Sequence, residues 1–266
     1  MGIITRVTER ARVYRTDAIV LRRSDLGEAD RVLTLFTPQH GKLRAVAKGA
    51  RRPGSRKAGH LEPFTLVNLL LARGRELDII TQAEAVRTFP QVRADLLRLS
   101  LAAYVAELTD RFGIQESDSH GLFQLAADTL DRLDREAVPD VALRYFQVRL
   151  LDLAGFRPEL FRCVSCSNAA QPVDQFFSLS EGGLLCPNCG PQREEALPLS
   201  LSALKILRHT QRSSYEQAAR PKLSPGVAQE VDGLLESYLS YVLERKLNVP
   251  GFVRQVRRLK EARVYS

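Results

Sequence analysis

The chain lacks the features of several large classes of protein. Among its 266 residues are no tryptophan, one methionine and four cysteines. No apolar run approaches the ~20 residues that a membrane-spanning helix needs. The N-terminal segment carries basic residues but no apolar core of the kind found in secretory signals. We therefore expect a cytoplasmic protein without a membrane segment, in which the cysteines are reduced rather than paired in disulfides.

Recognisable catalytic motifs are also missing. Neither a Walker A pattern nor G-x-G-x-x-G occurs, and the glycines lie in predicted turns. Four histidines are scattered, and none belongs to a nucleophile or metal-ligand motif: His40, His60, His120 and His209. The paired carboxylates Glu194 and Glu195 lie in a predicted linker before Pro198. The sequence thus predicts that the protein is not an enzyme.

Positive charge is concentrated in the N-terminal third of the chain. The formal net charge is +8, and residues 1–83 hold 16 Lys/Arg against 8 Asp/Glu. Residues 84–266 hold 23 of each, so the whole surplus belongs to the N-terminal part. A basic surplus of this kind favours acidic partners.

The densest basic stretch is residues 42–57, KLRAVAKGARRPGSRK, which contains no carboxylate. Its first half alternates like a strand, and its second half has the glycine and proline content of a mobile loop. A polyanion such as a nucleic-acid backbone suits this arrangement, although a solvated loop without function has the same composition. The candidate phosphate contacts are Lys42, Arg44, Lys48, Arg51, Arg52, Arg56 and Lys57.

The region around this stretch predicts a small β-barrel. Alternating, β-branched segments occur at 13–23, 31–36, from 42 onward, 64–72 and 77–86, with turn residues between them. Five short strands in about 75 residues fit the OB-fold, whose loops and one strand face bind oligonucleotides. An SH3-like barrel and an open sheet are the alternatives. Base stacking would have to use one of the few aromatic side chains, such as Tyr14, Phe36 or Phe64.

From about Pro90 the periodicity changes to that of amphipathic helices. Helices are predicted at 96–112, 119–133, 139–155, 200–211 and 225–247, with a last short helix after Pro250-Gly251. Their one-sided apolar pattern indicates a helical bundle. The last helix carries a basic face that is either solvated or a second contact for phosphates or a partner: Arg254, Arg257, Arg258, Lys260 and Arg263.

Four cysteines interrupt the helical region. Cys163 and Cys166 form one C-x2-C pair, and Cys186 and Cys189 form a second pair nineteen residues later. This spacing is typical of a tetrahedral zinc ion held by four thiolates. The alternatives are two redox-active dithiols or four unrelated thiols. Since four cysteines complete the coordination shell, the predicted zinc is structural.

Together these patterns predict an α+β, multi-domain chain. Residues 1–88 would form a five-stranded OB-fold barrel, residues 89–160 plus 192–266 a helical domain, and residues 161–191 a zinc-finger insertion.

Two segments also resemble a known family. Residues 17–53, DAIVLRRSDLGEADRVLTLFTPQHGKLRAVAKGARRP, and residues 150–160, LLDLAGFRPEL, are similar to the RecO family of bacterial recombination mediators. The four cysteines indicate its zinc-bearing branch. The resemblance implies a nucleoid-associated protein that binds single- and double-stranded DNA and anneals complementary strands. It further implies that the protein interacts with RecR and single-strand-binding protein and helps to load RecA. By the same resemblance, the barrel and the basic loop would be the DNA-binding region.

Two other functional classes fit the same features. An RNA-binding module of the translation or transcription apparatus would also combine a barrel with a zinc knuckle. A scaffold for protein partners would bind neither nucleic acid near 0.1 M salt.

Overall fold

The computed structural model describes residues 12–115 and 117–264, with side chains described as far as Lys260. The chain divides into two compact units. The first comprises Met1–Thr88 and Gly113–Phe123, and the second comprises Phe89–Phe112 and Gln124–Ser266. The first eleven residues of the predicted domain 1–88 lie outside the described part.

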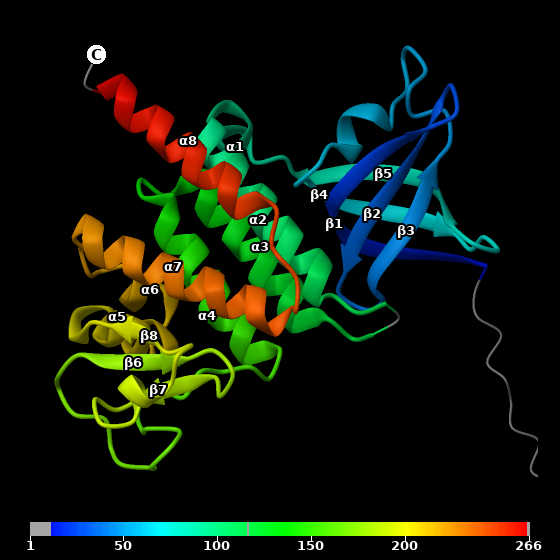
Figure 1. The fold of residues 1–266 in the computed structure, drawn as a ribbon. Helices are drawn as coiled ribbons and strands as arrows, with labels where there is room; N and C mark the ends of the chain where they lie inside the picture. The colour runs from blue at the N-terminus through cyan, green and yellow to red at the C-terminus, as the bar shows by residue number, and fades with distance from the viewer. Residues whose placement is uncertain (1–11, 116, 265–266) are drawn as a thin grey trace, which may run out of the picture. The chain divides into compact units, whose positions relative to one another are not determined.

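The first unit is built around a closed five-stranded barrel, with the strand order β1-β2-β3-β5-β4 (Figure 1). This confirms the predicted OB-type barrel and excludes the open sheet. The strands are β1 (Val13–Leu26), β2 (Asp30–Thr37), β3 (Gly41–Ala47), β4 (Leu66–Ala72) and β5 (Asp78–Arg87).

Strand β1 is long enough to serve two neighbours. Its first half pairs with β4 and its second half pairs with β2, and the register shifts between Val20 and Arg22. Closure on the other side comes from two parallel pairs between β3 and β5, Ala45 with Asp78 and Val46 with Ile79. Alternate side chains fill the interior, as the period of a strand requires. The short 3-10 helix η1 (Ala58–Leu61) contributes the fully buried Leu61 to this core.

The second unit is helical, as predicted. Its helices are α1 (Pro90–Ala94), α2 (Leu96–Phe112), α3 (His120–Arg135), α4 (Pro139–Leu153), α5 (Leu201–Arg212), α6 (Tyr215–Ala218), α7 (Pro225–Val242) and α8 (Val249–Val264). The first turn of α3 belongs to the first unit by its contacts.

Two predicted helix boundaries were wrong. Helix α7 ends at Val242, five residues early, and Glu244 adopts a left-handed backbone with φ of 51° that no helix continues through. Helix α8 begins at Val249, so Pro250 lies in its first turn rather than before it. Proline is tolerated there because the first N–H groups of a helix have no intrahelical acceptor.

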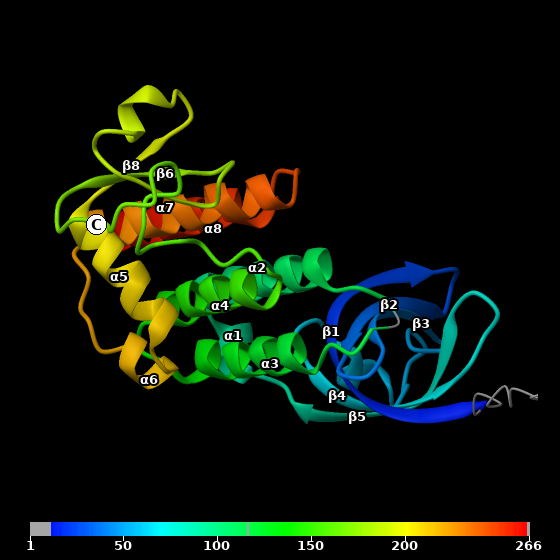
Figure 2. The same cartoon turned by 90° about the horizontal axis from the view of Figure 1, so that it is seen from below.

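Helix α2 is the centre of the second unit. Its buried residues extend over most of its circumference, among them Leu101, Ala102, Tyr104 and Ala106. It packs against α1, α4 and α8, and Figure 2 shows α2 and α4 between the α7–α8 layer and the α1–α3 layer. The predicted apolar face is buried, and the buried surface is wider than predicted because three helices pack against α2.

The basic face of α8 is largely neutralised by carboxylates, and Arg254, Arg258 and Lys260 are exposed, as expected for a solvated face. Arg254 pairs with Glu236 on α7, and Lys260 pairs with Asp95 at 2.7 Å. Arg257 bridges Asp140 and Asp232, and burial works against its charge while the two carboxylates raise its pKa. The side chain of Arg263 lies outside the described residues.

A three-stranded sheet, with the order β7-β6-β8, carries the cysteine insertion. Strands β6 (Gln175–Ser178) and β7 (Gly183–Leu185) form a hairpin between the cysteine pairs. The segment predicted as a linker instead supplies β8 (Leu197–Leu199), which pairs with β6. The Phe177 ring meets the Tyr238 ring of α7 edge-on at 5.3 Å, which fastens the sheet to the bundle.

None of the helices in the described ranges is long and apolar enough to cross a membrane.

The ion pairs of Arg257 provide a test of how α8 is held. Replacing Arg257 by Ala leaves two carboxylates, Asp140 and Asp232, without this cation in a partly buried setting. We expect the free energy of unfolding to fall by about 1–3 kcal/mol, measured by urea denaturation. The neighbouring Arg258 is exposed, so Arg258→Ala should change it by less than ~0.5 kcal/mol. Equal effects of the two substitutions would contradict this role.

Candidate metal centre and nucleic-acid interface

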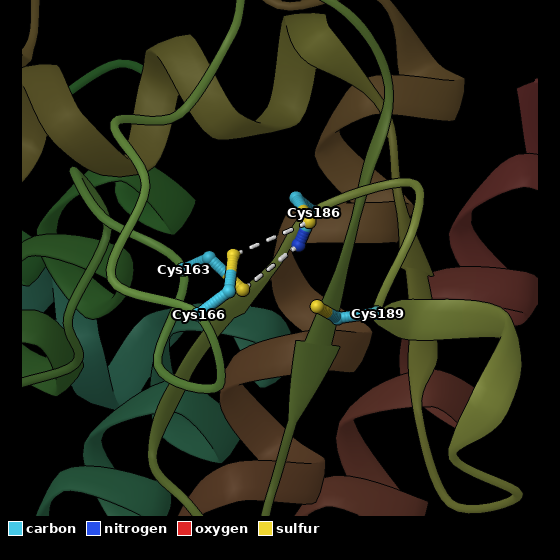
Figure 3. A group of neighbouring side chains, drawn as sticks. All are labelled: Cys163, Cys166, Cys186 and Cys189. Atoms are coloured by element: carbon cyan, nitrogen blue, oxygen red, sulfur yellow. Dashed lines mark hydrogen bonds between the residues drawn. The ribbon is translucent and has the colours of Figure 1, made fainter.

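The four cysteines converge on one point, although they come from segments twenty residues apart. Cys163 and Cys166 lie in a turn before the sheet, while Cys186 follows β7 and Cys189 precedes the 3-10 helix η2 (Gly190–Gln192). All four sulfur atoms lie within 4.8 Å of one another, as Figure 3 shows. The cysteines are therefore arranged as a group that could hold a metal ion.

Each cysteine pair is shaped by a tight backbone turn. Ser167 N–H donates to Cys163 O, and Gly190 N–H donates to Cys186 O, both at 2.8 Å. Ser167 closes the first turn with φ of 61°. Only glycine fits at position 190, because a Cβ atom there would lie 2.2 Å from the Phe176 ring. The backbone of Gly190 is not left-handed.

The electrostatics of the cluster favour a bound cation. Burial disfavours the Cys163 thiolate, but N–H groups of Cys166, Cys186 and Ser165 lower its pKa to about 6. A side-chain hydrogen bond with Cys186 raises the pKa of the Cys189 thiol to about 12. The pKa of one thiol is thus lowered and that of another is raised. This is expected of neighbouring thiols that cannot all ionise together without a positive charge between them.

The spacing of the sulfur atoms fits tetrahedral coordination. A metal–sulfur bond of ~2.3 Å, as in zinc sites, places neighbouring sulfur atoms of a tetrahedron about 3.8 Å apart. Cys166 Sγ and Cys186 Sγ lie 3.8 Å apart. The Cys186 N–H also points at Cys163 Sγ at 3.4 Å, a contact that stabilises a thiolate ligand.

Strand β3 carries two of the seven predicted phosphate contacts, Lys42 and Arg44, and a third, Lys48, directly follows its last residue. Lys42, Arg44 and Lys48 alternate with the buried Ala45 and Ala47, so the charged side chains point away from the core. The predicted alternation of this strand is confirmed.

The other four candidates lie in a loop of consecutive turns after β3. Gly49 N–H donates to Asp30 Oδ1 at 2.7 Å, and Arg51 N–H donates to Ala29 O at 2.9 Å. The guanidinium of Arg51 donates to Gly27 O and lies 3.4 Å from Asp25 Oδ2. The ammonium of Lys57 donates to Ile80 O at 3.2 Å. Arg51 and Lys57 therefore anchor the loop to the barrel.

The remaining cations are available to a ligand. The side chains of Arg44, Lys48, Arg52 and Arg56 are exposed. Within residues 12–115 and 117–264, none of them has a carboxylate partner. Exposed positive groups without internal partners are the chemistry that recognises phosphates.

A cleft that the sequence did not reveal lies beside Arg44. It has a volume of about 750 Å³ and is lined by β3, the start of β1, the β2–β3 turn and the β4–β5 turn. Two of its arginines, Arg73 and Arg75, lie in a turn that the sequence identified only as a hairpin connection. The Arg-Gly-Arg sequence of this turn shows that it is basic. That the turn lies beside β3 follows only from closure of the barrel, which the sequence does not show.

The predicted stacking aromatics lie in different environments. Phe36 is fully buried in the first unit, and Phe64 is half-buried with φ of 65°. Tyr14 lines the cleft, 4.9 Å from the His40 ring. His60 Nδ1 accepts a hydrogen bond from the backbone of Ala85, which gives this histidine a structural role.

A basic OB-type barrel joined to a helical unit with a four-cysteine cluster defines a class of nucleic-acid-associated proteins. Comparisons with known proteins identify the family. The family described as Recombination protein O N terminal matches residues 12–89, and Recombination protein O C terminal matches residues 93–250.

Curated relatives agree over nearly the whole chain. DNA repair protein RecO of Roseiflexus sp. is 42% identical over 250 residues, which cover 94% of this chain and 88% of the relative. DNA repair protein RecO of Desulforudis audaxviator is 39% identical over 246 residues, 91% of this chain and 97% of the relative. The chain belongs to the RecO family of DNA repair proteins.

The cysteine cluster makes a direct prediction. Replacing Cys166 or Cys186 by Ser removes one of four ligands, so the metal content per chain should fall from about one toward zero. Elemental analysis of purified protein measures this ratio, and the melting temperature should fall with it. Glu194→Gln, an exposed change beyond the second cysteine pair, is the control. A wild-type chain that folds without any metal would contradict the role of the cluster.

Proposed function

We propose that this protein is a recombination mediator that binds single- and double-stranded DNA through its barrel and anneals complementary strands. With RecR, it helps to load RecA onto strands coated by single-strand-binding protein. The alternatives from the sequence were an RNA-binding module and a plain protein scaffold. Membership of a DNA repair family supports the DNA-binding hypothesis over these two alternatives.

The observation that carries the proposal is the set of unpaired cations on the barrel. Arg44 lies on β3, Lys48 directly follows the strand, and Arg52 and Arg56 extend from the loop that comes next. Binding of DNA by such a surface is driven by release of the counterions condensed on the phosphates, so it needs no particular base sequence. This property suits a mediator that must act wherever a gap or break occurs.

Strand annealing follows from the same surface. Two complementary strands repel each other through their phosphates, and a protein that neutralises phosphates on both lowers this repulsion. Base pairing then supplies the free energy of the product. The proposed activity therefore requires no catalytic residue and no reacting cofactor.

We further propose that the metal is a structural zinc ion held by Cys163, Cys166, Cys186 and Cys189. Four thiolates at tetrahedral spacing are the donor set that zinc prefers in structural sites. The ion would hold together the two turns that enter and leave the small sheet. With four protein ligands it would have no open position for a substrate.

The proposed partners and location rest on membership of the RecO family. RecR, single-strand-binding protein and, indirectly, RecA are the proposed partners. A protein with this role would act in the cytoplasm at the nucleoid.

The basic loop can be tested by removing three of the four unpaired cations. The triple variant Lys48→Ala, Arg52→Ala and Arg56→Ala should bind single-stranded DNA more weakly, because phosphate contacts are lost. Each lost contact should also reduce the slope of log affinity against log salt by about 0.7. Fluorescence anisotropy over a salt series gives both quantities.

A charge-matched control separates specific contacts from overall charge. Arg220, Lys222 and Arg258 are exposed residues of the second unit, and their replacement by Ala removes the same charge. We expect this control to keep the wild-type slope. If the loop variant also keeps the wild-type affinity and slope, the proposed interface is wrong. Tighter binding to RNA than to DNA of the same sequence would favour the RNA-binding alternative.

A further inference from the structure

The cleft beside β3 has the composition of a nucleotide site. Its lining includes four cations, Lys42, Arg44, Arg73 and Arg75, against two carboxylates, Glu76 and Asp78. An excess of cations selects an anionic ligand, and a volume of about 750 Å³ is in the range of small-ligand sites. The cleft lies entirely within the first unit.

The aromatic floor of the cleft offers a stacking surface. The guanidinium carbon of Arg73 lies 4.7 Å from the centre of the Tyr14 ring, and the His40 ring meets the same tyrosine edge-on. A guanidinium plane supported on an aromatic ring is a platform on which an unstacked base can lie. Tyr14 is itself held in place, because its hydroxyl donates to Asp78.

One glycine in the lining of the cleft, Gly74, and one between two lining residues, Gly41, fix the backbone there. A Cβ atom on Gly74 would lie 1.9 Å from Leu77 O, and one on Gly41 would lie 2.0 Å from Ile114 O. The Gly74 N–H also donates to Asp78 Oδ1 at 3.2 Å, and Lys42 N–H donates to Ile114 O at 3.0 Å. The backbone is therefore close-packed at both glycines, so the cleft is a formed feature of the barrel.

Polar groups around the platform match the edge of a base. The side-chain amides of Gln39 and Gln115 and the carboxylate of Asp78 line the cleft. The Gln39 amide oxygen accepts from the Thr16 hydroxyl at 3.1 Å, which orients the group. Amides and carboxylates can bond with the donors and acceptors that a base exposes only when it is unpaired.

We propose that this cleft binds one unpaired nucleotide of a single strand. The base stacks on the Arg73–Tyr14 platform, and its phosphates lie against Arg44 and Arg75. Arg44 also belongs to the row of cations on β3, so the strand continues from the cleft toward Lys48. A base inside a duplex is stacked on both faces and cannot enter, so the cleft makes the barrel favour single strands. This inference rests on the proposed DNA-binding function.

Binding of an oligonucleotide and of its duplex, measured by anisotropy at one salt concentration, tests the proposal. Arg73→Ala should weaken single-strand binding by about fivefold or more, because stacking of a base is lost, and should change duplex binding much less. Arg75→Ala should also act mainly on the single strand. Arg15→Ala, which removes an exposed charge from the opposite side of β1 to Tyr14, should leave the preference for single strands unchanged.

Two further measurements separate stacking from charge. Arg73→Lys keeps the positive charge but not the planar group, so it should keep the salt slope while losing much of the single-strand affinity. An oligonucleotide with abasic residues keeps every phosphate and removes bases. It should bind the wild type more weakly, and Arg73→Ala should add little to that loss.

The outcomes distinguish the two proposals. If Arg73→Ala and Arg75→Ala bind single strands as the wild type does while the basic-loop variant loses affinity, the cleft proposal is overturned and the DNA-binding function stands. Equal losses on single strands and duplex would also overturn it, because the cleft would then supply only charge. A wild-type chain that binds neither form would overturn the proposed function itself.

Discussion

Closure of the barrel by two parallel pairs between β3 and β5 places the cleft beside the basic strand. The pairing of Ala45 with Asp78 brings the β4–β5 turn alongside the basic strand. Lys57 supports the same junction by donating to Ile80 O on β5. Because of this closure, Arg44 lines one cleft with Arg73 and Arg75, which lie about thirty residues further along the sequence. A barrel left open at this point would separate the cleft from the row of cations on β3.

Charge is used differently in the two units. In the helical unit, Arg254, Arg257 and Lys260 each meet a carboxylate, and the pairs hold α8 in place. On the barrel, Arg44, Lys48, Arg52 and Arg56 have no such partners among the described residues. A basic residue thus points to a phosphate contact only where its own fold does not neutralise it. The cysteine cluster is a third case, in which the compensating charge has to come from a metal ion.

Local patterns in the sequence predicted the elements, and contacts between distant segments decided the rest. Strand alternation gave the five strands of the barrel, and the spacing of the two cysteine pairs gave the cluster, because both depend on neighbouring residues. The anchoring of Arg51 by Asp25 and the pairing of Arg257 with Asp140 depend on tertiary contacts. The same is true of the cleft, whose two arginines looked like ordinary turn residues. Helix α2 has a wider buried surface than its apolar pattern predicted for a related reason, since α1, α4 and α8 all pack against it.

The central claim is that cations of the barrel neutralise phosphates and so bring complementary strands together. The most direct test is the rate of annealing of complementary strands coated with single-strand-binding protein. The account predicts that the wild type accelerates annealing and that the variant lacking Lys48, Arg52 and Arg56 does so much less. Annealing at the wild-type rate by that variant, in protein of unchanged stability, would contradict the account.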